Sequence, residues 1–292
     1  MQSSQPLVSV VIPCYNHEDF VQDSIQSVID QTYDNIELII IDDGSKDNSV
    51  IKIQEMIELC EKRFNRFEFR SRTNIGLSAT LNEALEWCQG KYFSPNASDD
   101  MILKNKIAIQ VGILEKDDEI IAVFGGVHFI DDSNKKKLNR FLPKRIIYNF
   151  EDIIMHRHNL PTPTYMTRLE AIKRVGGYKA NLIIEDWYMW LKLSEIGRIL
   201  YIDEVFALYR QHDNNMSKNL KKIQQGRLEV LGFFKGNLLY EEAIRNINWY
   251  NEVELYSSDK SIRGLISIFK KNPRKTINLT FKHLKYKYNI FL

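Results

Sequence analysis

Two adjacent carboxylates, Asp99 and Asp100, follow a short apolar run in the segment KYFSPNASDDM at 91–101. That run predicts a buried strand, and acids placed after it lie at the edge of a sheet, where open α/β sheets bind ligands. Carboxylates this close repel each other, so Mg²⁺ or Mn²⁺ is a natural partner when a phosphate supplies further oxygens. The alternative is a structural turn in which one of the acids caps the helix expected from Leu103.

Two other predicted strands also end in residues that could bind a nucleotide. Tyr15 follows the apolar run Leu7–Ile12, which Pro13 is expected to end, and Asp43 follows the run Ile36–Ile41. An aromatic ring can stack on a base, and a carboxylate can accept hydrogen bonds from the base or the ribose. The structural alternatives are a half-buried core aromatic and a plain β-turn.

The elements that must position these side chains alternate through the first hundred residues. We expect strands at 7–12, 36–41, 67–69 and 92–93, and helices at 18–30, from 47–49 to about 61, at 77–88 and at 103–114. This alternation predicts right-handed βαβ units and a mostly parallel sheet covered by helices on both faces. The loops after parallel strands meet at one edge, so the three groups of polar residues should converge.

A second pair of acids, Glu185 and Asp186, opens the apolar segment IIEDWYMWLKL at 183–193. Acids are stabilised at a helix N-terminus by the helix dipole, so capping is the structural interpretation. The functional interpretation is a general base that removes a proton from an attacking hydroxyl. We expect His156 and His158 to lie at the surface or on the acceptor side of the site, and a metal-binding pair is the alternative.

The motifs PCYN (13–16), IDDGSKDNS (41–49), NIG (74–76) and ASDD (97–100), in this order, resemble family 2 glycosyltransferases. The match covers roughly residues 6–215. The resemblance implies the GT-A fold, which is Rossmann-like with a mostly parallel sheet flanked by helices, and an inverting reaction. The QxxRW motif of processive synthases is absent, which favours transfer of one sugar per event.

The resemblance also implies roles for individual residues. Asp186 would be the general base, supported by Glu185, and Mn²⁺ or Mg²⁺ would be held by Asp99, Asp100 and His212, the histidine of the segment YRQH. The implied nucleotide-binding residues are Pro13, Tyr15, Asn16, Asp43, Arg72, Asn74, Ala97, Ser98 and Arg210. The chain departs from the family pattern at Ala97, where an acid is expected, so one carboxylate fewer can reach the ribose or the metal.

Composition places the chain among ordinary globular proteins. It has 292 residues, of which 44% are hydrophobic and 27% charged, and no apolar run reaches the ~20 residues of a membrane span. The N-terminus lacks a signal-peptide pattern. Three widely spaced cysteines form no zinc pattern, and we expect free thiols in a cytoplasmic protein.

The C-terminal segment Lys260–Leu292 carries nine Lys or Arg residues and no acid, whereas the rest of the chain has a formal charge of −7. A basic, partly apolar tail predicts peripheral binding to an anionic membrane surface at the inner face of the cell membrane. A helical cap on the catalytic domain and a homodimerisation element are the alternatives. No nucleic-acid-reading motif is present, so no nucleic-acid partner is expected.

These inferences predict a GT-A domain at 1–217, with a nucleotide-sugar half at 1–127 and an acceptor half at 128–217, and a helical basic extension at 218–292. The expected enzyme is a metal-dependent hexosyl- or N-acetylhexosaminyltransferase. It would move a sugar from a nucleoside diphosphate sugar, most simply a UDP-sugar, to a saccharide on a polyprenyl diphosphate lipid in bacterial O-antigen or capsule synthesis. One rival is a sugar-phosphate nucleotidyltransferase, which needs a glycine-rich N-terminal loop that the sequence lacks. The other is a non-catalytic nucleotide-sugar or glycan-binding module, which the alanine at 97 keeps open.

Overall fold

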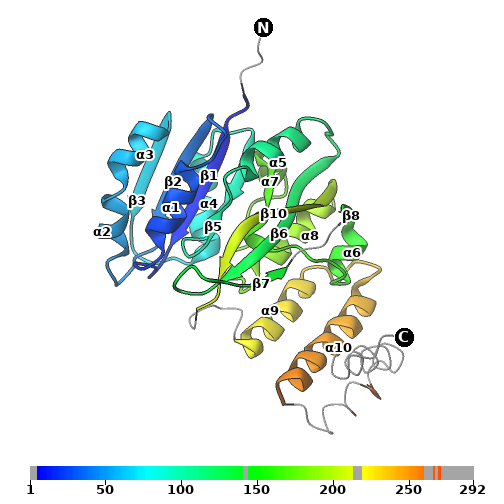
Figure 1. Cartoon of the computed structure of the whole chain (residues 1–292). Helices are drawn as coiled ribbons and strands as arrows, with labels where there is room; N and C mark the ends of the chain where they lie inside the picture. Colours follow the sequence, from blue (N-terminus) through cyan, green and yellow to red (C-terminus); the bar gives the residue numbers. More distant parts are fainter. Residues whose placement is uncertain (1–4, 141–143, 213–218, 260–265, 267–268, 271–292) are drawn as a thin grey trace, which may run out of the picture. The chain divides into compact units, whose positions relative to one another are not determined.

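The structure is a computed structural model that describes residues 5–140, 144–212, 219–259, 266 and 269–270 (Figure 1). The chain divides into two compact units. The first consists of Met1–Ile153 with His158–Asn215, and the second of Ile154–Arg157 with Met216–Leu292. Within the described ranges, no helix is both long enough and apolar enough to cross a membrane.

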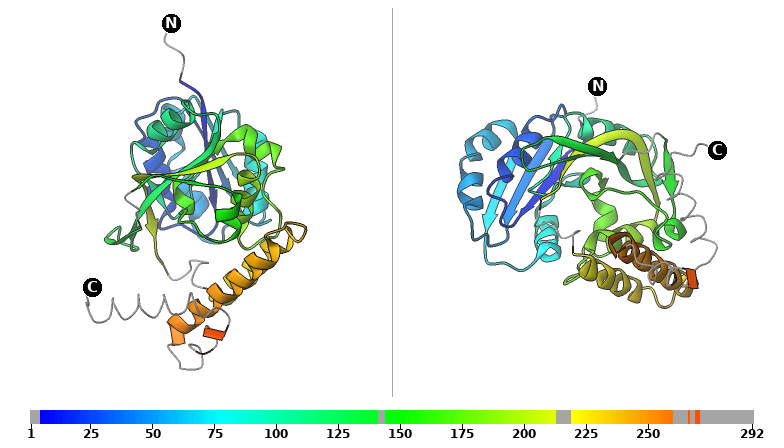
Figure 2. Two further views of the ribbon diagram at one scale, coloured as in Figure 1. Left: turned by 90° about the vertical axis from the view of Figure 1, so that its right-hand side faces the viewer. Right: turned by 60° about the horizontal axis from the view of Figure 1, so that its bottom comes forward.

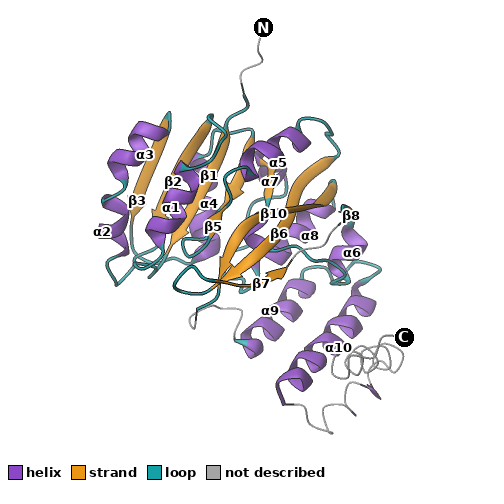
Figure 3. Ribbon diagram, viewed as in Figure 1, coloured by secondary structure: helices purple, strands orange, loops and turns teal. Residues whose placement is uncertain are grey.

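A single sheet runs through the first unit (Figure 3). Among the described residues it has ten strands, in the order β3-β2-β1-β4-β9-β6-β10-β5, with β7 paired to β6 and β8 paired to β10. The strands are β1 (Val8–Cys14), β2 (Ile36–Asp42), β3 (Arg66–Ser71), β4 (Tyr92–Pro95), β5 (Met101–Ile102), β6 (Ile120–Ile130), β7 (Lys136–Arg140), β8 (Ile146–Tyr148), β9 (Met166–Arg168) and β10 (Arg198–Arg210).

Strand direction decides where the polar loops meet. β1 is parallel to β2 and β4, β2 is parallel to β3, and β6 is parallel to β10. The short strand β9 is antiparallel to both β4 and β6, so these two strands run in the same direction. The carboxyl ends of β1, β2, β3, β4, β6 and β10 therefore lie at one edge of the sheet.

Helices cover both faces of this sheet (Figure 2). One face carries α1 (Val21–Ile29), α2 (Ser49–Gln54), α3 (Ile57–Arg63) and α5 (Lys106–Leu114), and its core includes Val10, Ile25 and Val111. The other face carries α4 (Leu77–Trp87), α7 (Leu169–Arg174) and α8 (Glu185–Ser194). There, Trp190 of α8 meets Phe124 of β6 edge-on at 5.4 Å. The predicted α/β fold, a mostly parallel sheet flanked by helices, is confirmed.

Several element boundaries differ from the expected ones. Pro13 does not end its strand, because β1 continues to Cys14 in register with β2. The helix expected to run to about Glu61 is two short helices, α2 and α3. The basic run at 135–137 is exposed and enters the short strand β7. Two further short helices are α6 (Phe150–Ile154) and η1 (Thr162–Thr164).

The second unit contains α9 (Leu220–Gly232) and α10 (Tyr240–Asp259). The segment 224–245, whose composition favours a helix, is divided between α9 and α10 by the break between Gly232 and Tyr240. Arg227 joins the two helices by donating hydrogen bonds to both carboxylate oxygens of Glu254, at 2.6 and 2.9 Å. Apart from residues 266, 269 and 270, the basic segment from Lys260 onward lies outside the described residues.

Candidate active site

The loops at the carboxyl edge contact one another directly. The backbone N–H of Asn16, after β1, donates to Ser45 Oγ, after β2, at 2.9 Å. His17 Nδ1 lies 2.7 Å from Ser98 Oγ, in the loop after β4. The loops after β1, β2 and β4 therefore form one continuous polar surface, as their expected place at one sheet edge predicts.

Asp43 is held by the turn that follows β3. Its Oδ1 accepts hydrogen bonds from the backbone N–H of Ile75 at 2.8 Å and from the Arg72 guanidinium, and its Oδ2 accepts from the N–H of Gly76 at 2.9 Å. Arg72 is also bonded to Glu83 at 2.7 Å. A carboxylate has about four acceptor positions, so Oδ2 keeps capacity for a ligand donor.

The other expected nucleotide-binding residues are spread around this edge. Tyr15 lies in the loop after β1 and is 45% exposed, which leaves its ring accessible for stacking. Asn16 accepts a hydrogen bond from Lys46 N–H at 2.7 Å, and Asn74 is exposed. The carbonyl of Ala97 accepts from Ser24 Oγ at 3.1 Å. Pro13 lies within β1 rather than in the loop.

A cluster of three potential metal ligands lies where β1, β4 and β10 end. His17, Asp99 and His212 each offer one ligand atom, and these atoms lie within 4.8 Å of one another. His212 Nε2 is 2.9 Å from Asp99 Oδ2. Burial would raise the pKa of Asp99, but the hydrogen bond with His212 and the nearby His17 outweigh burial and lower it. Burial lowers the pKa of His17, which favours a neutral imidazole.

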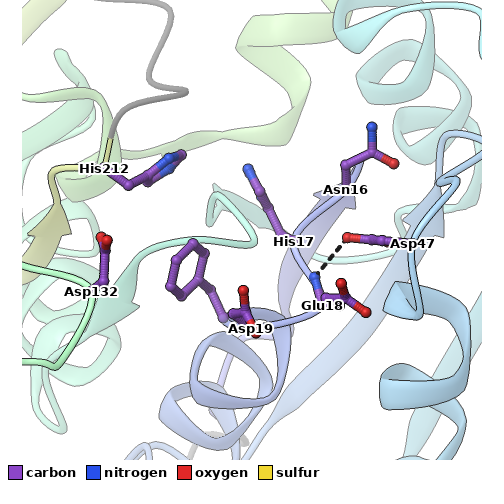
Figure 4. A pocket seen from close by; sticks show the side chains of 8 residues that line it. Asn16, His17, Glu18, Asp19, Asp47, Asp132 and His212 are labelled. Carbon is purple, nitrogen blue, oxygen red and sulfur yellow. Dashed lines mark hydrogen bonds between the residues drawn. The ribbon is translucent and has the colours of Figure 1, made fainter.

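A polar cavity of about 380 Å³ opens beside this cluster (Figure 4). It is lined by Asn16, His17, Glu18, Asp19, Phe20, Asp47, Asp132 and His212. The two imidazoles face the same space, and Asp47 accepts the backbone N–H of Glu18 at 3.0 Å on the opposite side. A ligand in the cavity could therefore reach both histidines.

Arg210 and Asp100 have structural positions that differ from the expected ones. Arg210 is fully buried, and its guanidinium donates to the carbonyl of Asp99 at 2.9 Å and to that of Asp131 at 2.9 Å. Asp100 lies outside the three-ligand cluster, because it is buried and accepts the backbone N–H of Arg210 at 2.8 Å. Burial and the charge of Asp99 raise the pKa of Asp100 well above its ordinary value. These two residues brace the loop that bears Asp99.

Glu185 and Asp186 begin α8 on the other face of the sheet. Thr162 Oγ1 donates to Asp186 Oδ2 at 2.6 Å, and the backbone N–H of Trp187 donates to Oδ1 at 2.6 Å. Burial raises the pKa of Asp186, and these two hydrogen bonds oppose the rise. Burial and the charge of Asp186 raise the pKa of Glu185 to about 8. Near neutral pH Glu185 therefore keeps its proton, and the hydrogen bonds from Thr162 and the Trp187 N–H favour the ionised form of Asp186.

Two site residues escaped the sequence analysis, and one suspected pair is separated. His17 directly follows the PCYN motif, and that position was its one sequence signal; Thr162 had none. His156 lies in the second unit against the Tyr250 ring, with centroids 4.9 Å apart, whereas His158 in the first unit packs edge-on against Trp190 at 5.5 Å. The two histidines are assigned to different units, and neither belongs to the group of three potential metal ligands found among the described residues.

Comparison with known proteins gives one family. Residues 9–175 match the family described as "Glycosyl transferase family 2". An "Uncharacterized glycosyltransferase" from Haemophilus influenzae is 28% identical over 98% of this chain and 93% of its own length. The "UDP-Glc:alpha-D-GlcNAc-diphosphoundecaprenol beta-1,3-glucosyltransferase WfgD" from Escherichia coli is 29% identical over 80% of this chain and 88% of its own length. Some relatives are longer: the match spans 40% of an uncharacterized glycosyltransferase from Rickettsia felis.

A solved structure has the same architecture. The "Mannosyltransferase PcManGT from Pyrobaculum calidifontis in complex with GDP-Man and Mn2+" is 14% identical, covers 97% of this chain and 81% of its own, and superposes with a TM-score of 0.66. At this identity the likeness concerns the fold, and it confirms the predicted GT-A architecture.

Proposed function

Because this chain belongs to glycosyl transferase family 2, we propose that it moves one sugar from a nucleoside diphosphate sugar to a hydroxyl group of a saccharide, with inversion at the anomeric carbon. The observation that carries the proposal is the cluster of His17, Asp99 and His212 at the shared carboxyl edge of β1, β4 and β10. It combines ligands for a cation with an adjoining cavity, and a bound cation would supply the positive charge that a diphosphate leaving group requires.

The residues of the cluster fit a divalent cation. Asp99 is ionised, the imidazole of His17 tends to neutrality, and all three ligand atoms lie close together. We assign Mn²⁺ or Mg²⁺ to this cluster, with Asp99 and His212 as expected ligands; the solved mannosyltransferase complex contains Mn²⁺. When bound, the cation would supply positive charge that stabilises the departing diphosphate.

The donor would lie along the edge formed by the loops after β1, β2 and β3. Tyr15 is exposed for stacking on the base, and Asp43 keeps an acceptor position for a base or ribose donor. Arg72 holds Asp43 in place. A UDP-sugar is the proposed donor, because the Escherichia coli relative is named for UDP-Glc.

Asp186 is the proposed general base. Its carboxylate is oriented by Thr162 and by the backbone N–H of Trp187, and it would accept the proton of the acceptor hydroxyl as that oxygen attacks the anomeric carbon. Glu185, whose pKa is about 8, stays protonated at neutral pH and so does not compete for this proton. The reaction breaks the bond between the anomeric carbon and the diphosphate oxygen, and the electron pair leaves with the nucleoside diphosphate.

We assign the acceptor to the class of saccharides on polyprenyl diphosphate lipids in bacterial surface polysaccharide synthesis. The Escherichia coli relative, named for a diphosphoundecaprenol-linked acceptor, supports this class. A lipid-linked acceptor requires access to a membrane surface, and the basic segment from Lys260 onward would provide it at the cytoplasmic face. The proposed organisation is a donor half at 1–127, an acceptor half at 128–217 and an extension at 218–292, which the second compact unit supports.

Transfer assays with a panel of nucleotide sugars and a short-chain lipid-diphosphate acceptor test this function. We expect wild type and the surface control Glu195→Gln to form product, and Asp186→Asn to lose roughly 100-fold or more of kcat while still binding donor. Full activity of Asp186→Asn would overturn the base assignment. Donor binding without transfer by folded wild type, across the acceptor panel, would favour the binding-module rival.

A further inference from the structure

His17 adds a nitrogen ligand that the sequence motif for the metal did not include. It comes from the loop after β1, whereas Asp99 follows β4 and His212 follows β10. The cluster therefore contains two imidazoles and one carboxylate, drawn from three separate strands. The segment ASDD at 97–100 contributes no ligand to the cluster besides Asp99. Ala97 has no ligand atom in its side chain, and Asp100 accepts the backbone N–H of Arg210.

Both imidazoles are held in position by neighbouring residues. His17 Nδ1 is hydrogen-bonded to Ser98 Oγ at 2.7 Å, which leaves Nε2 as its ligand atom. The His212 ring lies 5.3 Å from the Phe20 ring and 5.6 Å from the His17 ring, measured between centroids. His212 and Asp99 are buried and His17 is half-buried. The ligands are thus preorganised, and the cavity leaves further coordination positions open to water or phosphate oxygens.

This ligand set distinguishes between cations. Mg²⁺ prefers oxygen ligands in near-octahedral geometry, whereas imidazole suits transition metals, and two histidines with one carboxylate and open positions form a recurrent transition-metal site. Building on the cation assigned above, we propose that His17 is a third protein ligand and makes this site selective for transition-metal ions over Mg²⁺. Affinity should rise from Mn²⁺ to Co²⁺, following the usual order for such ligands.

Metal binding to the full chain without nucleotide tests the proposal independently of activity. Pulsed electron paramagnetic resonance of bound Mn²⁺ reports coordinated ¹⁴N, and calorimetry gives affinities for Mn²⁺, Co²⁺ and Mg²⁺. We expect two coupled imidazole nitrogens in wild type and one in His17→Gln, with roughly 10- to 100-fold weaker Mn²⁺ binding in the variant. His128→Gln, which removes a histidine outside the cluster, should match wild type. Ser98→Ala should weaken binding but keep two nitrogens, since Ser98 is a positioning residue.

Fewer than two coupled nitrogens in wild type, or equal affinities for Mg²⁺ and Mn²⁺, would overturn the proposal even if His17→Gln did not fold. An unchanged signal in folded His17→Gln would also overturn it. Failure of the proposed function gives a different pattern, namely two coupled nitrogens and Mn²⁺ selectivity with no sugar transfer. Conversely, sugar transfer supported equally by Mg²⁺ and Mn²⁺ would overturn the metal selectivity and leave the function standing.

Discussion

Thr162 donates a hydrogen bond to Asp186 over 2.6 Å and links the short helix η1 to the start of α8. This contact is one of those that oppose the burial-driven rise in the pKa of Asp186. It therefore favours the ionised form of the proposed base and orients it, and a residue without a side-chain hydroxyl in place of Thr162 should affect both properties.

Thr162→Val should raise the pKa of Asp186 further and shift the acidic (low-pH) arm of the activity profile to higher pH. We expect kcat/KM near neutral pH to fall at least about tenfold, because a hydrogen bond to a charged group is lost. Thr162→Ser, which keeps the hydroxyl, is the matched control. The measurement is kcat/KM against pH, and superimposable profiles for wild type and Thr162→Val would contradict the role of this contact.

Glu185 should make stability depend on pH. The pKa of Glu185 is raised from 4.5 to about 8 in the folded state. Its contribution to the free energy of unfolding is therefore fully present below its pKa in the unfolded chain and is lost as pH rises through about 8. Glu185→Gln should remove this loss and flatten the fall in Tm between about pH 5 and pH 9. Thermal melts of both proteins across that interval provide the measurement. An equally steep fall in the variant would place the responsible group elsewhere.

Lys106 should make stability rise with pH, which is the opposite of the effect expected for Glu185. Its buried ammonium donates to Ser94 Oγ at 2.5 Å and to the carbonyl of Tyr165 at 3.3 Å, and burial lowers its pKa from 10.5 to about 7. The unfolded chain binds more protons between these values, so stability should rise with pH across that window. Lys106→Met should abolish this rise, and Lys104→Met, at an exposed position, should keep it. Urea unfolding at several pH values decides between these outcomes.

Asn82 of α4 fixes the segment that leads to α8. Its Nδ2 donates to the Tyr178 carbonyl and its Oδ1 accepts the Tyr178 N–H, both at 2.8 Å. A Cβ at Gly177 would lie 2.7 Å from that Oδ1, and φ there is +72°, so glycine is required. Asn82→Ala should cost about 1–3 kcal/mol of stability, since two backbone groups lose their partners. Asn82→Asp, which keeps the acceptor, should cost less. Equal unfolding midpoints for wild type and Asn82→Ala would refute this.

The sequence was sufficient for the strands β1 to β4 and for the edge where the polar loops after them meet. Continuous apolar β-branched runs such as Ile36–Ile41 are characteristic of strands buried on both faces, and the acids after them marked the strand ends. The sequence was insufficient where a residue's role depends on contacts between distant loops. Arg210 donates hydrogen bonds to the carbonyl groups of Asp99 and Asp131, which lie more than 70 residues away in the sequence. No local sequence pattern encodes such a contact.

The same limit explains the missed histidine, whereas the break in the helical pattern at 224–245 has a local cause. His17 is identified as a potential metal ligand by its proximity to Asp99 and His212, which lie near it because β1, β4 and β10 end at the same edge of the sheet. The helical pattern across 224–245 contains no proline, and the break between Gly232 and Tyr240 is stabilised by local backbone hydrogen bonds, such as that from Asn237 N–H to the Phe234 carbonyl at 2.9 Å. Gly236 and Asn237 are local signals for this break, because glycine disfavours a helix interior and the Asn237 side chain accepts the backbone N–H of Leu239 at 2.9 Å.

Calorimetric titration with UDP, GDP and dTDP, each with and without Mn²⁺, tests the central claim most directly. The titrations should include wild type, Asp99→Asn and the surface control Asp118→Asn. The account predicts Mn²⁺-dependent binding of at least one nucleotide to wild type and to the control, and its loss in Asp99→Asn. No binding to folded wild type, or unchanged binding to Asp99→Asn, would contradict the assignment of this edge as a nucleotide-sugar site.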